Sequence, residues 1–393
     1  MIWPSGRASS RTPASACNSR APFVSACPRA DRRTGTLWAP DAHRKPMASS
    51  KPAHGPVTIK DIAAALGISH TTVSRALNDH PKLSDDTKAR VRQAAQELGY
   101  VLNASGRILR GGASPLVGLV IPDIQNDFYS AIAKRLAERC RDAGFQMVLA
   151  ITEDDPQAEC GEVQALIQAR AAGIVITPSP APLPRTVELL AGTPAVQLIR
   201  SVATLATDVV AMDDAAAAHA AAAHLLSLGH RRVGYVGGHA RIKPGRDRLR
   251  GFVRAHAEAG LEPDPDLIVQ VPPRQEFGAE AMRRLLAARQ RPTAVVIGSS
   301  ELTIVALAVI REHGLSIPSD ISVVGYGDPK WYELTTPPLT AVRLPIEALA
   351  ASTAELVFAR IAAQARPGEP ASAPRKLRIR PELIARGSAV PRR

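Results

Sequence analysis

The sequence predicts a small all-α N-terminal head followed by a two-lobed α/β core built on doubly wound parallel sheets. Two short helical patterns joined by a glycine-containing turn predict the head, as a helix-turn-helix. Short apolar runs that alternate with helical stretches from residue 116 onward predict the core. The 393 residues, of which 45% are apolar, are sufficient for several domains with sizeable cores.

Residues 1–56 show no hydrophobic period and are rich in Pro, Ser, Ala and Arg. We expect a disordered basic tail, or one that is not translated, because Met47 would also serve as a start. Lys and Arg exceed Asp and Glu by ten over residues 1–115 but only by three over the remainder. This excess predicts a polyanionic partner for the N-terminal third, although a tail that only improves solubility explains much of it.

The composition argues against several classes of protein. The four cysteines show no CxxC spacing, which argues against a disulfide framework and a zinc site and fits a reducing cytosol. The sequence contains no run of 18 apolar residues, so it predicts no membrane span, and no secretory signal is evident. The GxSxG, P-loop and HExxH motifs are also missing, and "GYVGGH" lacks the spacing of a dinucleotide site. We therefore expect no metal site, no cofactor and no enzymatic activity.

The first helix of the head is predicted within "TIKDIAAALG". Thr58 is its N-cap, and Asp61 three residues later completes an approximate capping box. Gly67 ends the helix, because glycine readily adopts the left-handed conformation that follows a helix. Three apolar residues form its predicted inner stripe: Ile62, Ala63 and Leu66.

The second helix lies within "GISHTTVSRALN", residues 67–78, and Ser69 is its predicted N-cap. Its apolar residues fall on one side of the helix and form a packing stripe: Val73, Ala76 and Leu77. Its polar residues fall together on the opposite side: Thr71, Ser74, Arg75 and Asn78. This opposite face carries no carboxylate, unlike the face of an ordinary solvated helix.

A third helix follows in "DDTKARVRQAAQELGY", with Ser84 as its cap and with Asp85 and Asp86 in the first turn, where the helix dipole favours them. Its predicted inward-facing residues are Val91, Ala95 and Leu98. In a helix-turn-helix the second helix lies in the DNA major groove, where Arg suits guanine and Asn suits adenine. The alternative is a three-helix bundle used for protein contacts.

The segments "VTIKDIAAALGISHTTVSRALN" and "LSDDTKARVRQAAQELGYVLNASGRILRGG" resemble the DNA-binding head of the lactose-repressor family of bacterial regulators. In that family the residues that match His70, Thr71 and Arg75 read the operator. The resemblance implies a head over residues 57–102. The DNA-contacting residues that it implies there are Thr58, Ser69, His70, Thr71, Thr72, Ser74, Arg75 and Asn78.

The same resemblance implies a hinge helix that lies in the minor groove, within a hinge and linker over residues 103–115. The residues that would contact DNA there are Asn103, Ser105 and Leu109, of which the leucine is wedged between base pairs. Gly106 stands where the family usually has alanine, and this costs about 1 kcal/mol of helix stability. We expect the hinge to be unfolded without DNA; a plain linker is the alternative.

The core is predicted over residues 116–390, where nine apolar runs indicate strands. They are "LVGLVI", "QMVLAI", "GIVIT", "AVQLI", "VVAM", "RVGYVG", "LIVQV", "AVVIGS" and "ISVVGY". The segments "AAHLLSLGHRRVGYVGG", "RLRGF", "IREHGLSIPSDISVVGYGD" and "PPLTAVRLP" resemble the core of the same family. That core is similar to periplasmic sugar-binding proteins, which are pairs of doubly wound lobes.

Ligands of such folds bind at the carboxyl ends of strands, in the crevice. Six residues at strand or helix ends are therefore predicted to bind an effector: Asn126, Phe128, Arg248, Ser300, Asp328 and Trp331. Arg248 matches the family arginine that binds the effector, with an ordinary exposed helix cation as the alternative. Trp331 could offer a stacking surface or simply pack in the core. Gly327 and Ser300 depart from the family's usual acid and amide at these positions.

We interpret the chain as a cytoplasmic, nucleoid-associated transcription regulator of the lactose-repressor type. The resemblance implies double-stranded, pseudo-palindromic operator DNA as one partner and a small-molecule effector, a sugar or sugar acid, between the lobes. It implies a homodimer, or a higher oligomer, whose symmetry matches that of the operator. Two alternatives are a solute-binding receptor without a DNA role and an enzyme on the same α/β scaffold.

Overall fold

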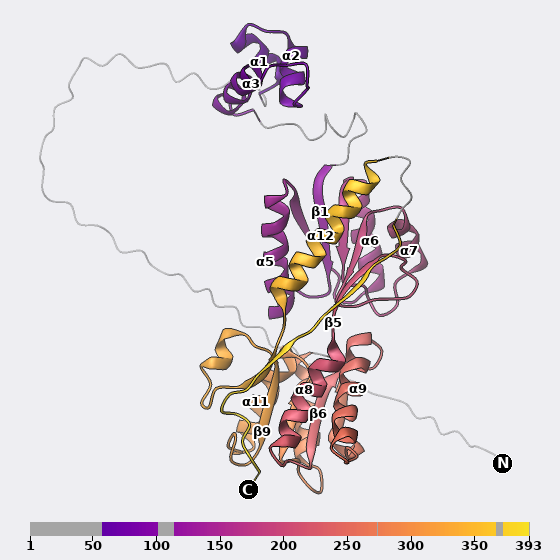
Figure 1. Ribbon diagram of the computed structural model, residues 1–393, viewed down its shortest axis with the longest axis vertical. Coiled ribbons are helices and arrows are strands. Elements are labelled where there is room, and N and C mark those ends of the chain that lie inside the picture. Colours follow the sequence, from indigo (N-terminus) through magenta and orange to yellow (C-terminus); the bar gives the residue numbers. More distant parts are fainter. Residues whose placement is uncertain (1–56, 101–113, 273, 367–371, 393) are drawn as a thin grey trace, which may run out of the picture. The chain divides into compact units, whose positions relative to one another are not determined.

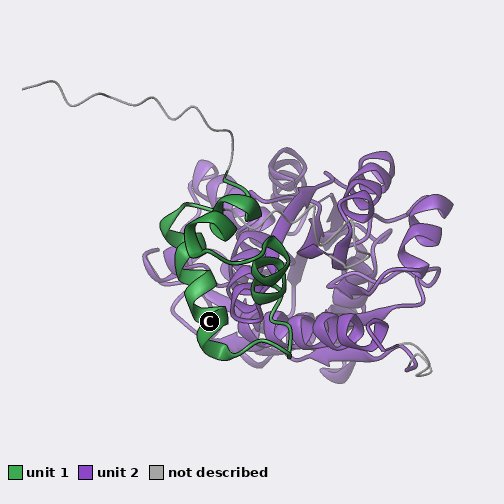
Figure 2. Cartoon of the chain, turned by 90° about the horizontal axis from the view of Figure 1, so that it is seen from above, with its two compact units in different colours: residues 1–101 green, residues 102–393 purple. Residues whose placement is uncertain are grey.

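The structure is a computed structural model that describes residues 57–100, 114–272, 274–366 and 372–392 (Figure 1). The chain divides into two compact units, residues 1–101 and 102–393, which Figure 2 distinguishes by colour. The predicted tail lies outside the described residues, and so do the hinge residues Asn103, Ser105 and Leu109. Within the described ranges, no helix is long and apolar enough to cross a membrane.

The described residues of the first unit, 57–100, form three helices: α1 (Ile59–Leu66), α2 (His70–Leu77) and α3 (Asp85–Glu97). The predicted capping box is confirmed, since the backbone N–H and Oγ1 of Thr58 donate to Oδ2 of Asp61 at 2.7 and 2.8 Å. Gly67 has φ 63°, which gives α1 its left-handed end. The tight turn that follows joins α1 to α2 and so completes the helix-turn-helix.

The predicted caps of the other two helices are also confirmed. The Ser69 hydroxyl accepts the backbone N–H of Thr72 at 3.1 Å, and the Ser84 hydroxyl accepts that of Thr87 at 3.3 Å. The buried core of this unit consists of Ile62, Ala63, Val73, Ala76, Val91 and Ala95. These residues come from all three helices, so the small unit has a core of its own.

One expected core residue of the head is wrong, because Leu98 is 39% exposed. Leu98 is the residue that caps α3, and Gly99 follows it with φ 69°, which turns the chain back. The N–H of Tyr100 then bonds to the carbonyl of Ala95 at 2.8 Å. Tyr100 therefore packs against the core in the place that the helical pattern assigned to Leu98.

The second unit contains two six-stranded sheets, one in each lobe. All nine predicted apolar runs form strands: β1 (Ser114–Ile121), β2 (Gln146–Ile151), β3 (Ala171–Ile176), β4 (Ala195–Leu198), β5 (Asp208–Met212), β6 (Val233–Gly238), β7 (Ile268–Val271), β8 (Ala294–Ile297) and β9 (Ser322–Gly327). Three shorter strands complete the sheets: β10 (Thr340–Arg343), β11 (Lys376–Ile379) and β12 (Glu382–Ile384). The strand orders are β11-β5-β4-β3-β1-β2 and β12-β10-β9-β8-β6-β7.

Among the described residues, every pair of neighbouring strands is parallel except β10 with β12, which are antiparallel. The helices of the first lobe are α5 (Asp127–Asp142), α6 (Pro156–Gln168), α7 (Pro184–Ala191) and α12 (Ile346–Gln364). Those of the second lobe are α8 (Asp214–Ser227), α9 (Lys243–Glu258), α10 (Gln275–Leu286) and α11 (Ser300–Glu312), with the short helices η1 (Pro265–Leu267) and η2 (Lys330–Glu333). The predicted two-lobed α/β core is thereby confirmed.

The chain passes between the lobes three times, after β5, after β10 and between β11 and β12 (Figure 1). The first and third passages are bonded to each other, since the N–H of Asp213 donates to the carbonyl of Ile379 at 3.0 Å. This bond ties the segment that follows β5 to the end of β11, where both segments leave the first sheet. This arrangement positions the first turn of α8 beside the cleft.

Helices α8 and α9 approach each other closely at Gly251. A Cβ atom at this position would lie 2.0 Å from the carbonyl oxygen of Ala215, which is backbone and cannot move aside. By contrast, a Cβ atom on Gly161 in α6 would meet nothing within 4 Å. The two helical glycines thus provide a crowded and an open position at which the same substitution can be compared.

We expect Gly251→Ala to lower the free energy of unfolding by about 1–3 kcal/mol, because the helices must separate to admit the methyl group. Gly161→Ala should raise it by about 0.5–1 kcal/mol, because alanine has the higher helix propensity. Urea unfolding of the two variants checks this. Equal effects of the same sign would contradict the close packing of α8 on α9.

A DNA-contacting helix and an interlobe ligand cleft

The outer face of α2 presents three of the predicted DNA-reading side chains to solvent. His70, Thr71 and Arg75 are all exposed, whereas Val73 and Ala76 are buried against α1 and α3. No acidic residue occurs in α2. The helix therefore offers donors, hydroxyls and a guanidinium without a carboxylate that would repel phosphates.

Other residues of the predicted DNA-contacting set have polar atoms that stabilise helix ends. Thr58 belongs to the capping box of α1, and the hydroxyls of Ser69 and Thr72 lie 2.8 Å apart at the start of α2. The Nδ2 of Asn78 donates to the carbonyl of Ser74 at 2.5 Å, which closes the last turn of α2. These local bonds fix the orientation of the exposed helix.

The crevice between the lobes contains a large cavity of about 620 Å³. From the first lobe it is lined by Pro122, Asp123, Ile124, Gln125, Tyr129, Ile151, Glu153, Asp154 and Arg200, and from the second by Arg274, Gln275, Glu276 and Glu301. Five carboxylate side chains thus face two guanidinium groups, and Arg200 is already paired with Asp154. Burial raises the pKa of Glu301, and the nearby carboxylates of Asp123 and Asp127 raise it further. The cavity is therefore acidic.

A second cavity of about 80 Å³ lies deeper in the crevice, and it brings together four of the six predicted effector-binding residues. Asn126, Phe128, Arg248 and Ser300 all line it. Asn126 is also the N-cap of α5, where its Oδ1 accepts the N–H of Phe128 at 3.0 Å. These four predicted residues therefore lie together around one cavity, although that they bind an effector stays a prediction.

Arg248 is not an exposed helix cation, because only 11% of its side chain is accessible. Its Nε donates to Oδ1 of Asp214 at 2.7 Å, and its Nη1 donates to the carbonyl of Gly298 at 2.5 Å. The guanidinium lies 4.1 Å from the ring centroid of Tyr326, whose hydroxyl donates to the same Oδ1 at 3.0 Å. Burial opposes the charged form of Arg248, but Asp214 and Tyr326 raise its pKa above the ordinary value.

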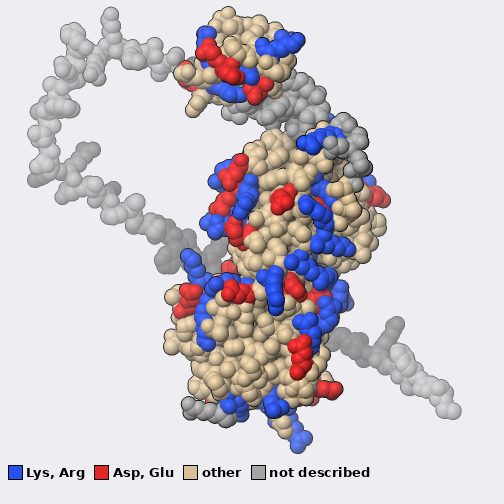
Figure 3. All heavy atoms as spheres, in the orientation of Figure 1, with Lys and Arg blue, Asp and Glu red and all other residues tan. Residues whose placement is uncertain are grey.

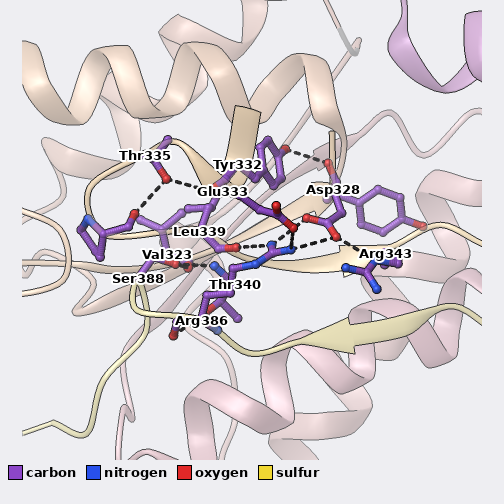
Figure 4. Close-up of polar contacts among 12 residues, drawn as sticks. Val323, Asp328, Tyr332, Glu333, Thr335, Leu339, Thr340, Arg343, Arg386 and Ser388 are labelled. Atoms are coloured by element: carbon purple, nitrogen blue, oxygen red, sulfur yellow. Dashed lines mark hydrogen bonds and ion pairs between the residues drawn. The ribbon is translucent and has the colours of Figure 1, made fainter. Parts of the chain in front are cut away.

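The structure places Asp328 elsewhere, and not among the residues that line these two cavities (Figure 4). Its carboxylate accepts from Nη1 of Arg386 at 2.6 Å and from Nε of Arg343 at 2.8 Å, and its side chain is only 4% exposed. Burial alone would raise the pKa of Asp328, yet these two arginines lower it. Asp328 thus anchors the strand that follows it and the C-terminal segment, because both of its oxygens are already bound.

Trp331 also lies outside the lining of both cavities. It is partly buried against the core of the second lobe, and its ring contacts Tyr332 edge-on with centroids 4.4 Å apart. This geometry agrees with the core-packing alternative and removes the stacking surface from the cleft.

Several lining residues were missed by reasoning from sequence. Asp123, Asp154 and Arg200 come within three residues of the ends of β1, β2 and β4, so the strand-end rule could have found them. Tyr326 is the residue before Gly327 at the end of β9 and was equally accessible to that rule. Across the described part of the chain, no group of three His, Cys, Asp or Glu side chains could hold a metal ion.

Comparison with known proteins agrees with this geometry. Residues 58–103 match the family described as bacterial regulatory proteins, lacI family, and residues 222–389 match a periplasmic binding protein-like domain. The HTH-type transcriptional regulator DegA of Bacillus subtilis is 33% identical over 338 residues, which cover 85% of this chain and 98% of DegA. The chain belongs to the lacI family. As its relatives do, this lacI-family protein acts as a DNA-binding transcriptional regulator with an effector-binding core.

Other lacI-family relatives extend the comparison. The transcriptional regulator GalR of Escherichia coli is 32% identical over 77% of this chain and 88% of GalR. Among solved structures, a CelR–cellobiose complex is 28% identical over 84% of this chain and 99% of its own, with a TM-score of 0.63. The Lac repressor dimer bound to operator and an anti-inducer, 23% identical over 86% of this chain and all of its own, has a TM-score of 0.73 and supports the same fold.

We expect Asp328→Asn to lower the free energy of unfolding by about 3 kcal/mol at neutral pH, since it leaves Arg386 and Arg343 beside each other without their carboxylate. The folded-state pKa of Asp328 is lowered, so its contribution is present above the unfolded value of about 3.9 and is lost as pH falls through the folded value. Denaturant unfolding between pH 3 and 7 should therefore show the difference from wild type shrinking below about pH 4.

Glu347→Gln is the control for this prediction, because Glu347 pairs with Arg139 and Arg135 on an exposed surface. An exposed pair contributes little, so this variant should unfold like wild type. If Asp328→Asn also unfolded like wild type, the Asp328 carboxylate would not be needed for stability, which would contradict its role as an anchor.

Proposed function

We propose that this chain is a sequence-specific repressor that binds operator DNA through α2 and releases or tightens it in response to an effector in the interlobe cleft. The observation that carries the proposal is the exposed, carboxylate-free face of α2, with His70, Thr71 and Arg75, in a head that matches the lacI family. The head over residues 57–102 would read the major groove, and the hinge and linker over residues 103–115 would contribute Asn103, Ser105 and Leu109.

The effector that fits the cleft best is a neutral hydroxylated molecule such as a sugar. Asn126, Arg248 and Ser300 supply hydrogen-bonding groups at the deeper cavity, and Phe128 supplies an apolar surface. The carboxylates of the outer cavity would repel an anion, which argues for a sugar rather than a sugar acid. The CelR structure holds cellobiose, a neutral sugar.

A homodimer on a pseudo-palindromic operator fits the same proposal. Apolar side chains remain exposed on the edge strand β2 and on α10 and α11: Leu149, Phe277 and Ile304. Such apolar side chains suit a contact with a second copy. We infer a cytoplasmic, nucleoid-associated regulator without catalytic activity, as its relatives are transcription regulators.

We expect Arg75→Ala to weaken operator binding by about 1–3 kcal/mol and to relax preference at one base pair, because Arg75 would lose a base-edge contact. Binding to random-sequence DNA should change little. Titrations of fluorescent operator and random duplexes at one salt concentration measure both.

Arg90→Ala is a matched control, since Arg90 is an exposed arginine of the same head but lies on α3. It should leave base preference intact. Equal losses on operator and random DNA for Arg75→Ala would show that Arg75 contacts phosphate and does not read sequence.

We expect Arg248→Lys to retain operator binding and to lose the response to the sugar that raises the melting temperature of the wild type most in a thermal-shift screen. Lysine keeps the charge beside Asp214 but cannot make the forked contacts of a guanidinium. Arg250→Lys is the control, because Arg250 is an exposed neighbour on α9. A full response in Arg248→Lys would remove Arg248 from the effector site.

A further inference from the structure

A separate groove lies on the side of the core where β11 and the start of α9 meet. Its cavity measures about 680 Å³, within the range of small-molecule sites. Four cationic side chains line it: Lys243, Arg246, Lys376 and Arg378. None of the described lining residues is Asp or Glu, which distinguishes this basic groove from the acidic cleft. In Figure 3, Lys and Arg side chains gather near the junction of the two lobes.

The floor of the basic groove is one face of the first sheet. Lys376 pairs in register with Val209, and Arg378 with Ala211. Register partners in a parallel sheet point to the same face, so the two cations lie beside the apolar residues Val209 and Ala211 of β5 on that face. Because β11 is the edge strand, Lys376 and Arg378 remain exposed.

One wall of the basic groove is held in place before any ligand arrives. Gln197, which is 1% exposed, donates through Nε2 to the carbonyl of Leu205 at 3.0 Å and to the hydroxyl of Thr207 at 3.2 Å. Its Oε1 accepts the N–H of Val202 at 2.8 Å. These three bonds fix the loop over residues 201–207, part of which lines the groove, so little ordering is required on binding.

The opposite wall comes from the other lobe, through the first turn of α9. Lys243 forms an ion pair with Asp247. Nη1 of Arg246 donates to the carbonyls of Ala240 and Arg241 at 2.9 and 3.1 Å. Within the described part of the chain, neither Lys376 nor Arg378 forms an ion pair. Cations of both lobes thus face one cavity that no described carboxylate lines, and the nearby Asp208 is already paired with Arg360. The mutual repulsion of these cations favours an anion between them.

We propose that the basic groove is a second ligand site, distinct from the effector cleft, for a small molecule that carries two phosphate groups, such as a sugar bisphosphate. The preformed wall, the volume and the apolar floor suit a compact metabolite, and the four cations supply charge-assisted bonds to phosphate oxygens. A ligand held there is contacted by both lobes. It therefore stabilises the lobe arrangement in which β11 and α9 lie together.

Calorimetric titration of the full chain with fructose 1,6-bisphosphate tests the proposal, with fructose and inorganic phosphate as comparison ligands at one ionic strength. The assay contains no DNA, so its outcome does not depend on the proposed operator function. We expect the bisphosphate to bind and fructose not to do so at this site. Lys376→Gln with Arg378→Gln should weaken bisphosphate binding about tenfold or more, and Arg246→Gln should weaken it as well.

The matched control is Lys134→Gln with Arg141→Gln, which removes the same charge from exposed positions of α5 in the same lobe. It should leave bisphosphate affinity unchanged. Equal weakening in this control would show only a general attraction to a basic protein and would overturn the proposal. So would a wild type that does not bind the bisphosphate, or binding that Arg248→Lys abolishes while the groove variants retain it, because the anion would then occupy the cleft.

Discussion

The buried ion pair between Arg248 and Asp214 is the interaction on which the arrangement of the core depends. Asp214 lies in the first turn of α8, directly after the first passage between the lobes, where the helix dipole favours a carboxylate. Its Oδ1 accepts from Arg248 and from Tyr326, so it joins α8 to α9 and to β9. Since an unpaired buried charge is costly, these elements must stay together for either charge to be tolerated. The same guanidinium lines the deeper cavity, so a ligand bound there would lie next to the stabilising pair.

Charge is distributed so that the two cavities of the core favour different chemistry. The outer cleft gathers carboxylates from both lobes, whereas the basic groove gathers cations from both lobes. Like charges that face one another across a crevice resist closure unless a ligand or a partner charge separates them. A neutral sugar in the cleft would satisfy hydrogen bonds without adding charge, while an anion in the groove would neutralise the repulsion. As proposed, the two sites would be complementary ways of biasing one movement of the lobes.

Local rules predicted the parts of this structure that depend on a few neighbouring residues. The capping box at Thr58 and the left-handed Gly67 require only their own turn, and the nine apolar strands are buried enough to show in the sequence. β11 was not predicted because "KLRI" is a strand of only four residues at the exposed edge of the sheet, in which two cations leave no apolar run like those of the buried strands. Asp328 was misplaced because the residues that bind it, Arg343 and Arg386, are 15 and 58 positions away, and no local pattern reveals such a pairing.

The ion pair between Asp328 and Arg386 shows how the C-terminal segment contributes to the core. Arg386 follows β12, and its guanidinium bonds to Asp328 and to the carbonyl of Leu339, while Ser388 bonds through its hydroxyl to the carbonyl of Val323 at 2.7 Å (Figure 4). The last described residues therefore close the second sheet after the chain has crossed between the lobes a third time. Because β11 belongs to one sheet and β12 to the other, the short connection at residues 380–381 is one of the three crossings that must absorb any change in the angle between the lobes. That connection lies one residue beyond the strand that carries Lys376 and Arg378, so an anion in the basic groove would act at the crossing itself.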